Sequence, residues 1–490
     1  AGKGNYMHVN YHDRQTPQFR ILSDQQAEAV YLATLECLRR TGVEIGNKEA
    51  RELLADAGAR VDGSRVYIPS VLVQDAIAAT PRSFTLWGRD GMHRMQIAPD
   101  RVYFGPGPTC TYFIDPETGE RRKARRGDSG MTARVCDALE NIDYAMGLGL
   151  ISDVTPTIAP VYEFAEMIAN TGKPVLGWAY TLQNVMDIYR IAVAVAGSEQ
   201  AFRQRPFFAL FSTFQSPLQH TDHDLENVLW AAEQDIPIVY LGGTIIGLTS
   251  PATGASSLVI YLAGALSGLT IIQLKRKGTP VVIGGVPNAM DLRTARAAYG
   301  APEMSLYSAA AADLSRYLKL PFMGTAGASE SKLLDSQAAI ESTIQVLMSA
   351  LSGATLVHDV GFLDCADIGS LPLLVMNDEI IAIVKRIMGG VEVNDDTLML
   401  DLIDQVGPGG HFIAEPRSAN LCRQELWVPR LMDRDAHVVW AQSGKKSMEE
   451  RVWKKLQEIL RTHEPPPLPE GTTEQINAIL QKVESRESGN

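Results

Sequence analysis

Eight short apolar runs in the middle of the chain constrain its fold more than any other feature of the sequence. Each run leads into turn-forming Gly, Pro, Ser or Asn, and most are separated by stretches with helical periodicity. Apolar strands that alternate with helices are typical of a parallel sheet covered on both faces. Eight strand–helix units predict a closed (β/α)8 barrel. The runs begin at Arg101, Tyr144, Pro174, Pro206, Pro237, Pro280, Pro321 and Ala354.

The segments between the runs favour the same fold. In residues 222–235 the apolar positions Leu225, Val228, Leu229 and Ala232 follow the spacing of a helix with one buried face. Five runs open with Pro, which ends the preceding helix and removes a donor that the first position of a strand does not need. A doubly wound open sheet is the rival fold. It is disfavoured because no G-x-G-x-x-G follows the early strands.

The rest of the chain surrounds this barrel. We expect an N-terminal extension over residues 1–100, the barrel over 101–365 and a C-terminal helical segment packed on the barrel over 366–490. Helices are predicted near 23–41, 48–57, 371–388 and 397–406. The Pro-rich segment 465–471 predicts an extended linker before a last helix.

Charge and cysteine content restrict the partners and the compartment. The net charge is −12 and no basic run is sustained, which argues against nucleic acid as a partner. Five cysteines without C-x-x-C spacing favour a reducing compartment, and the cytoplasm is the expected one. The first twenty residues lack the apolar stretch of a signal peptide.

One segment is apolar enough to raise the question of a membrane. Residues 236–274 contain no charged residue. Pro237, Pro251 and many Gly, Ser and Thr residues divide the segment into a strand, a loop and a buried helix, so we expect no membrane insertion. Lys275 and Gly278 are typical of the end of that helix, since cations oppose the helix dipole and Gly adopts the left-handed conformation.

Barrel enzymes bind their substrates at the carboxyl-terminal ends of the strands. Aromatic and amide side chains dominate those ends here, and few carboxylates or metal-binding groups accompany them. Aromatic faces attract quaternary ammonium groups, so this composition suits a cation that has no hydrogen-bond donor. For any single aromatic, packing in the core is the competing interpretation. The candidates are Tyr103, Phe104, Asp153, Trp178, Tyr180, Phe214, Gln215, Gly242, Gly243, Asn288, Glu330, His358, Asp359 and Phe362.

Other polar residues have both a functional and a structural interpretation. His358 interrupts an apolar strand at its carboxyl end, where it either contacts ligand or is a hydrogen-bonded core histidine. Arg316 either binds a carboxylate or is a solvated helix-end residue. His220 and His223 lack the H-E-x-x-H pattern of a zinc site, and Cys365 is expected to be a small buried thiol. The basic residues between Arg121 and Arg126 form a solvated loop or a patch for an acidic partner.

Four longer stretches resemble the trimethylamine methyltransferase family. They are GTAGASESKLLDSQAAIES (324–342), ALSGATLVHDVGFLD (350–364), PVVIGGVPNAMDLRTARAAYGAPE (280–303) and GGHFIAEP (409–416). The resemblance covers nearly the whole chain. It implies a TIM barrel that passes a methyl group from an amine to the cobalt of a separate corrinoid protein.

The resemblance also points to a substrate class. The archetypes of the family carry pyrrolysine in the loop after the seventh strand, whereas Thr325 to Ser329 are ordinary residues here. The chain therefore resembles the non-pyrrolysine branch, whose known substrates are quaternary amines such as glycine betaine. A quaternary amine leaves as a neutral tertiary amine, so positioning rather than acid–base catalysis is expected. Because the positive charge disappears, aromatic and neutral amide groups suit the transition state better than a carboxylate cage.

The same resemblance implies how the rest of the substrate and the acceptor are handled. His358, Arg316 or backbone amides would hold the carboxylate of glycine betaine. The chain lacks the D-x-H-x-x-G motif of cobalamin-binding modules, so no tightly bound cofactor is expected and a partner would supply the corrinoid. A homo-oligomer is compatible with the sequence. A metal-assisted barrel hydrolase or lyase, and a betaine-binding protein without activity, are the alternatives.

Overall fold

The computed structural model describes residues 18–99 and 101–489, and it contains a parallel barrel sheet. Seven strands are joined in the order β6-β16-β15-β13-β12-β10-β9. Each of them begins inside one of the predicted runs. The strands are β6 (Tyr103–Phe104), β9 (Val175–Trp178), β10 (Phe208–Thr213), β12 (Ile238–Ile246), β13 (Val281–Asp291), β15 (Phe322–Thr325) and β16 (Leu356–His358).

Residues 143–147 close the barrel between its first and last labelled strands. The Asp143 amide donates to the Phe104 carbonyl at 2.7 Å, and the Leu176 amide donates to the Ala145 carbonyl at 3.0 Å. Ala145 forms a parallel bridge to Val175. The run predicted at Tyr144 thus occupies the eighth position, although it pairs over too few residues to form a regular strand. The (β/α)8 barrel is confirmed.

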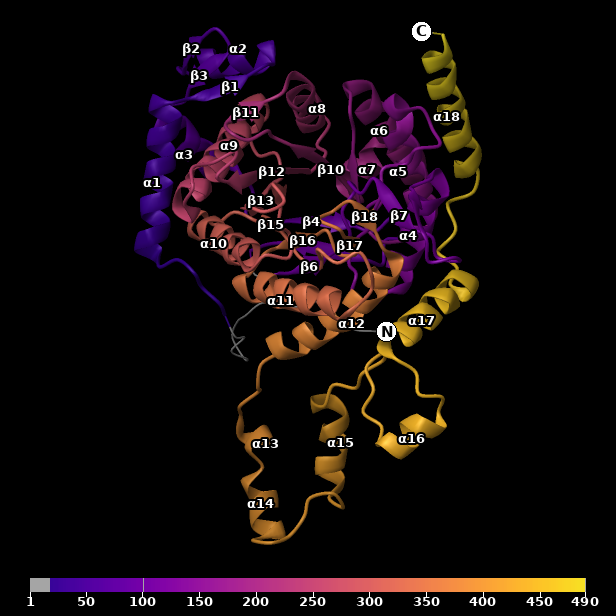
Figure 1. Cartoon of the computed structure of the whole chain (residues 1–490). Coiled ribbons are helices and arrows are strands. Elements are labelled where there is room, and N and C mark those ends of the chain that lie inside the picture. Colours follow the sequence, from indigo (N-terminus) through magenta and orange to yellow (C-terminus); the bar gives the residue numbers. More distant parts are fainter. Residues whose placement is uncertain (1–17, 100, 490) are drawn as a thin grey trace.

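Helices surround this sheet, as the alternating pattern predicts (Figure 1). The helix predicted at 222–235 is α8, and its four apolar positions are buried. The apolar helix α9 is long enough to cross a membrane, but 78% of its apolar window is buried inside the protein. The helices around the barrel are α4 (Arg126–Ala138), α5 (Ala159–Ala169), α6 (Leu182–Ala196), α7 (Glu199–Gln204), α8 (Asp222–Glu233), α9 (Gly254–Lys275), α10 (Pro302–Leu318), α11 (Ser336–Ser352) and α12 (Leu371–Met388), with the 3-10 turn η1 (Pro156–Ile158) before α5.

A hairpin of β4 (Phe84–Trp87) and β5 (Arg94–Ile97) covers the amino-terminal end of the barrel. The Trp87 amide donates to the carbonyl of Pro206, which precedes β10. Leu86, Met95 and Ile97 are buried in the same core as the inward-facing residues of the barrel strands. The opposite, carboxyl-terminal end is therefore the one available to a substrate.

The remaining N-terminal elements pack on the side of the barrel. Helix α1 begins after the capping box of Ser23 and Gln26, and α1 and α3 lie against α9 (Figure 1). The elements are α1 (Asp24–Arg40), β1 (Val43–Ile45), α2 (Lys48–Asp56), β2 (Arg60–Asp62), β3 (Arg65–Tyr67) and α3 (Ser70–Ala79), and β1 pairs with β11 (Gln219–His220). Residues 1–17, most of the segment that lacks the apolar stretch of a signal peptide, lie outside the described residues.

A second small sheet lies beyond the barrel strands and was not predicted. It contains β7 (Tyr112–Ile114), β8 (Arg121–Lys123), β17 (Phe362–Leu363) and β18 (Ile368–Gly369). Strand β8 carries part of the basic cluster, which is largely paired: Arg122 bonds Asp115 and Asp128, and Arg126 bonds Glu166. These contacts leave less of the cluster free for an acidic partner than the sequence suggested.

The C-terminal segment is mostly helical, and part of it leaves the body. Residues 389–447, here called the arm, extend below the barrel in Figure 1. The helix predicted at 397–406 is broken at Met399, which has a φ of 48°. After the arm, α17 packs on α12 and α4, and α18 packs on α6 and α5. The helices are α13 (Asp395–Leu398), α14 (Leu400–Val406), α15 (Pro416–Glu425), α16 (His437–Gln442), α17 (Met448–Thr462) and α18 (Thr472–Ser488).

The Pro-rich linker joins α17 to α18, as predicted, and residues 463–469 have no regular secondary structure. Arg89 donates hydrogen bonds to the carbonyls of Pro466 and Pro467. These contacts tie the linker to the loop between β4 and β5. The domain boundaries at residues 100 and 365 stay a prediction.

Candidate active site

Four side chains form one layer near the carboxyl-terminal end of the barrel. Trp178 is the last residue of β9 and pairs in register with Phe211 of β10. The Phe211 ring centroid lies 5.9 Å from that of His358, the last residue of β16. Thr325 ends β15 and pairs in register with His358. The structure thus brings the predicted residues Trp178 and His358 into one layer, together with Phe211, which the sequence did not single out.

The His358 imidazole is held from both of its nitrogen atoms. Nδ1 lies 2.5 Å from Asp359 Oδ1, and Nε2 lies 3.0 Å from Thr325 Oγ1. Because the Asp359 carboxylate accepts, Nδ1 carries the proton, and in the neutral ring Nε2 accepts from the Thr325 hydroxyl. All three side chains are buried. The imidazole is therefore oriented rigidly rather than free to turn toward a ligand.

Asp359 reaches His358 because the backbone around it is unusual. Its φ is 72°, in the left-handed region that few non-glycine residues adopt. A Cβ atom at Gly107 would lie 2.2 Å from Asp359 Oδ1, so only glycine fits at that position. The loop that follows β6 thereby accommodates the carboxylate beside β16.

A buried carboxyl group that was not among the sequence candidates lies beside Trp178. Glu163 of α5 accepts a hydrogen bond from Trp178 Nε1 at 3.0 Å, and it is 1% exposed. A Cβ atom at Gly147 would lie 2.2 Å from Glu163 Oε1, so this glycine makes room for the carboxyl group. Tyr180 packs edge-on against Trp178, with ring centroids 4.7 Å apart, and is 46% exposed. Tyr180 thus connects the indole to solvent.

The environment of Glu163 favours its neutral form. Burial raises the pKa of this carboxyl from 4.5 to about 8, against the opposing effect of the hydrogen bonds from Trp178 and the Gly147 backbone. Its second oxygen, Oε2, is buried and has no hydrogen-bond partner among the described residues. A buried carboxyl group with a strongly shifted pKa, bonded to the residue that ends a barrel strand, is the kind of group found at functional sites.

Glu163 adds a buried carboxyl group to the candidates, which already included Asp359. Strand spacing cannot reveal Glu163, because it lies on a helix. The sequence does contain one indication, because α5 is apolar nearly all the way around. Such a helix is buried on every side, so a glutamate within it is buried as well. Which groups this glutamate meets depends on contacts that no local pattern contains.

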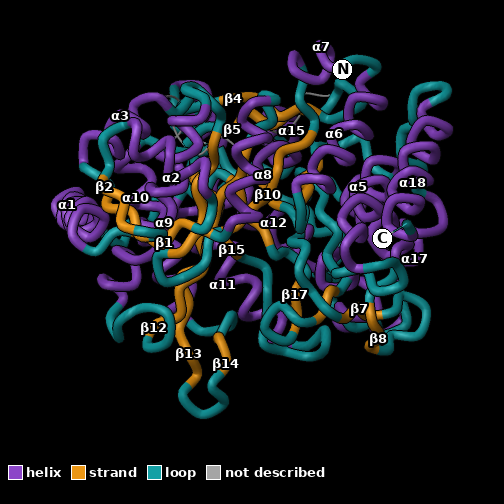
Figure 2. Tube along the Cα trace, turned by 90° about the horizontal axis from the view of Figure 1, so that it is seen from above, coloured by secondary structure: helices purple, strands orange, loops and turns teal. Residues whose placement is uncertain are grey.

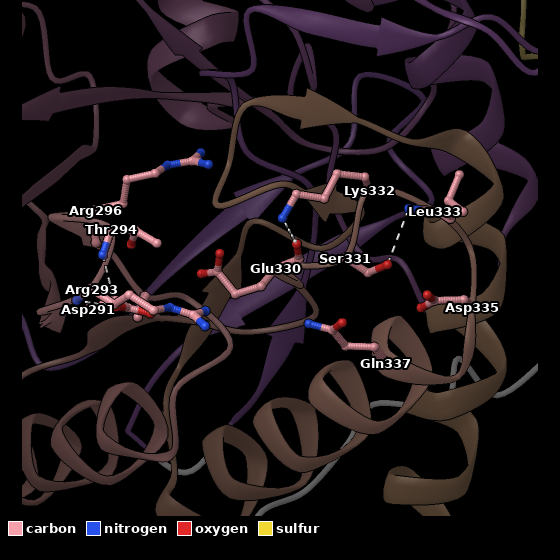
Figure 3. Close-up of a pocket in the computed structure, with 12 residues that line it drawn as sticks. Asp291, Arg293, Thr294, Arg296, Glu330, Ser331, Lys332, Leu333, Asp335 and Gln337 are labelled. Carbon is pink, nitrogen blue, oxygen red and sulfur yellow. Dashed lines mark hydrogen bonds between the residues drawn. The ribbon is translucent and has the colours of Figure 1, made fainter.

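A cleft of about 540 Å³ lies between two of the loops that follow barrel strands (Figure 3). One wall is the hairpin of β13 and β14 (Arg296–Ala297), which extends beyond the body in Figure 2. The other wall is the loop after β15 with the start of α11. Arg293, Arg296 and Lys332 contribute positive charge, whereas Asp291, Glu330 and Asp335 contribute negative charge. The cleft is polar and differs from the aromatic layer.

Three more predicted residues lie near the strand ends but make other contacts. Glu330 lines the cleft, and its Oε1 accepts from the Tyr299 amide at 2.5 Å. Asn288 is buried on β13, and its Nδ2 has no hydrogen-bond partner among the described residues. Gln215 is exposed just after β10.

Four predicted site residues lie away from the layer. Tyr103 faces the closed end of the barrel, where its hydroxyl accepts from the Gln96 amide of β5 at 3.0 Å. Phe104 and Phe362 are fully buried in the core outside the barrel. Arg316 bonds Asp313 and the Ser352 carbonyl at the end of α10. Packing and ion pairing account for these four positions.

His220 and Cys365 have structural partners. His220 Nδ1 and Nε2 each lie 2.7 Å from a hydroxyl, of Tyr240 and Ser267, and burial lowers the pKa of this imidazole to about 3. Cys365 Sγ donates to the Ala297 carbonyl at 2.8 Å, and burial raises the pKa of its thiol to about 11. Over residues 18–99 and 101–489, no three His, Cys, Asp or Glu side chains gather in a metal-binding arrangement.

Comparison with known proteins identifies the family. The model of the family described as trimethylamine methyltransferase matches residues 2–487. A trimethylamine methyltransferase of Desulfitobacterium hafniense is 33% identical over 94% of this chain and 93% of its own length. A glycine betaine methyltransferase of the same species is 27% identical over 95% of this chain and 97% of its own length.

A solved structure supports the fold independently. The monomethylamine methyltransferase of Methanosarcina barkeri superimposes with a TM-score of 0.53 at 11% identity, over 92% of this chain and 89% of that one. At this identity the likeness concerns the fold alone. Together with the sequence matches over nearly the full length, these findings show that the chain belongs to the trimethylamine methyltransferase family.

Proposed function

We propose that the protein transfers a methyl group from a quaternary amine, with glycine betaine as the first candidate, to the Co(I) of a corrinoid protein. The main support for this proposal is the layer of side chains at the carboxyl end of the barrel. There Thr325, at the start of the stretch where the family archetypes have pyrrolysine, bonds His358 beside Phe211 and Trp178. The 27% identity to a glycine betaine methyltransferase supports the substrate class.

The side chains of this layer suit a substrate that needs positioning rather than proton transfer. Trp178 and Tyr180 offer aromatic surface to the ammonium group, an attraction worth about 0.5 to 2 kcal/mol per ring. The corrinoid supplies the nucleophile that accepts the methyl group. The amine then departs without charge, so no residue has to protonate it. Trp178 and His358 are both fixed by hydrogen bonds, which limits the entropy lost when the substrate is oriented.

The carboxylate of the substrate needs a donor, and the structure changes which donor we favour. Both His358 nitrogen atoms are already engaged, and Arg316 lies at the other end of the barrel. Asn288 has a buried amide nitrogen without a partner among the described residues. An unpaired buried donor costs about 1 to 3 kcal/mol, which a bound carboxylate would recover. We therefore assign the carboxylate to Asn288.

The corrinoid protein must reach the same end of the barrel, because the methyl group is transferred there. The β13–β14 hairpin and its cleft lie beside that end and extend outward (Figures 2 and 3). Leu292 at the hairpin is 88% exposed, next to Arg293. We propose this hairpin as part of the docking face for the partner.

The proposal is tested by mixing the protein with free cob(I)alamin and single amines while the absorbance of methylcobalamin is recorded. Glycine betaine is expected to react, whereas trimethylamine is not. Reaction with trimethylamine alone would contradict the substrate class. Binding of quaternary amines without any methyl transfer would instead identify a betaine-binding protein.

A further inference from the structure

Glu163 is in an unfavourable position if its only role is to hold the fold together. Its carboxyl group is buried and accepts one side-chain hydrogen bond, from Trp178, while Oε2 is unpartnered among the described residues. Leaving a polar atom in this state costs free energy unless something else compensates. The neighbouring Gly147 leaves just enough room for the carboxyl group, so the position is specific in shape as well as in chemistry.

The carboxyl group lies next to the aromatic surface on which a cation would bind. A cation over an indole face sits within about 6 Å of the ring centroid. Glu163 bonds the edge of the indole of Trp178, which also packs against the half-exposed Tyr180. The negative charge of an ionised Glu163 would therefore attract a cation that lies against these two rings, and it would also increase the electron density of the indole that donates to it.

We propose that Glu163 is the residue that selects for the positive charge of the substrate, by losing its proton when a quaternary ammonium group binds against Trp178 and Tyr180. The identity of the natural substrate rests on the proposed function, but the selection of charge does not. When the methyl group is transferred, the C–N bonding electrons stay on the departing amine. The substrate charge is lost, and Glu163 takes a proton back from solvent.

The loss and return of this proton explain how a buried carboxyl group can serve a reaction in which the substrate loses its positive charge. A permanently ionised group would stabilise the bound cation more than the transition state. A carboxyl whose pKa is about 8 in the free protein is mostly neutral at pH 7, so only part of the attraction is gained on binding. Glu163 can therefore select for cations while lowering the rate of methyl transfer only slightly.

Other charged groups around α5 are engaged elsewhere. Tyr180 is the titratable group whose interaction with Glu163 contributes to a pKa shift, since the Glu163 charge raises the pKa of the phenol in addition to burial. The pairs on the packed helices are Arg126 of α4 with Glu166, Asp187 of α6 with Arg190 and with Arg486 of α18, and Glu484 of α18 with Tyr162.

The test uses tetramethylammonium as the probe and isothermal calorimetry without any corrinoid. In the wild-type protein the affinity should rise from pH 6 to pH 8, by at most about tenfold per pH unit, and level off above. Calorimetry in buffers of different ionisation enthalpy should show proton release at pH 7. An affinity that is independent of pH, without proton release, would overturn the proposal even if methyl transfer occurs.

Two variants and two ligands of similar shape test whether Glu163 selects the charge of the ligand or its shape. Choline and its uncharged carbon analogue 3,3-dimethylbutan-1-ol have nearly the same size. The wild-type protein should prefer choline, and Glu163→Gln should reduce that preference by about tenfold, as expected from the loss of roughly 1.4 kcal/mol. Glu166→Gln, on the same helix but paired with Arg126, should keep it. An unchanged preference in Glu163→Gln, or no preference in the wild type, would refute the assignment. Methyl transfer can fail while these binding results hold, so the two proposals are distinguishable.

Discussion

At the scale of single residues, the site depends on a few buried polar groups whose partners lie far away in the sequence. The sequence makes His358 a candidate because it interrupts an apolar strand, and Trp178 because it ends one. Glu163 could not be assigned to the site, because its partner Trp178 is on another element and Gly147 on a third. Tyr103 is the opposite case: it lies on a barrel strand, as predicted, but its side chain faces the closed end of the barrel.

The raised pKa of Glu163 makes a prediction about stability. The carboxyl ionises near pH 4.5 in the unfolded chain and near pH 8 in the folded one. Between these values the folded protein holds a proton that the unfolded chain has released, so the unfolding free energy falls with rising pH by up to about 1.4 kcal/mol per unit.

Glu163→Gln removes the contribution of this carboxyl group to the fall in unfolding free energy with rising pH. Urea unfolding at pH 5, 6.5 and 8 should therefore show the variant gaining stability relative to the wild type by a few kcal/mol as the pH rises. A constant difference across the three pH values would show that Glu163 ionises normally in the folded protein.

At the scale of elements, the sequence predicted the barrel well because its signals are local. Apolar runs, Pro at strand starts and the Ser23 cap each act over a few residues, and seven strands begin within the predicted runs. The β4–β5 hairpin and the sheet of β7, β8, β17 and β18 were missed, because these short strands depend on distant contacts rather than on periodicity.

Gly147, in the segment that closes the barrel, allows a test of whether cation binding depends on the position of the Glu163 carboxyl group. In Gly147→Ala the new Cβ would lie 2.2 Å from Glu163 Oε1, so the carboxyl group must move. We expect a loss of about 1 to 3 kcal/mol in stability from overpacking, together with weaker binding of tetramethylammonium.

Gly127→Ala is the matched control, because a Cβ at this position in α4 has no atom within 4 Å. It should keep both stability and binding. Wild-type binding in Gly147→Ala would mean that the position of Glu163 does not matter for the cation.

At the scale of the whole molecule, the arm of residues 389–447 differs from the rest of the protein. Twelve of the twenty-four exposed large apolar side chains among the described residues lie on it. Its helices α13 to α16 are short, and helices of this length are unstable alone in water. Large exposed apolar patches mark interaction sites. The surface of α11, with Ile340 and Ile344 exposed, lies on the side of the body from which the arm extends (Figure 1).

We therefore predict that a second copy of the chain covers the arm. Sedimentation velocity should show a dimer or larger assembly at micromolar concentration. The double substitution Ile413→Asp and Val428→Asp should dissociate it, because both side chains are more than 70% exposed on the arm. Val61→Asp, on the N-terminal sheet, should not. A protein that stays monomeric at all concentrations would refute this prediction.

Methyl transfer from glycine betaine to cobalt can be followed with an isotope label on the methyl group itself. Glycine betaine with deuterated N-methyl groups is incubated with the protein and cob(I)alamin, and both products are measured by mass spectrometry. We expect dimethylglycine and trideuteromethyl-cobalamin in equal amounts. Undiminished glycine betaine, with methyl transfer from trimethylamine under the same conditions, would contradict this expectation.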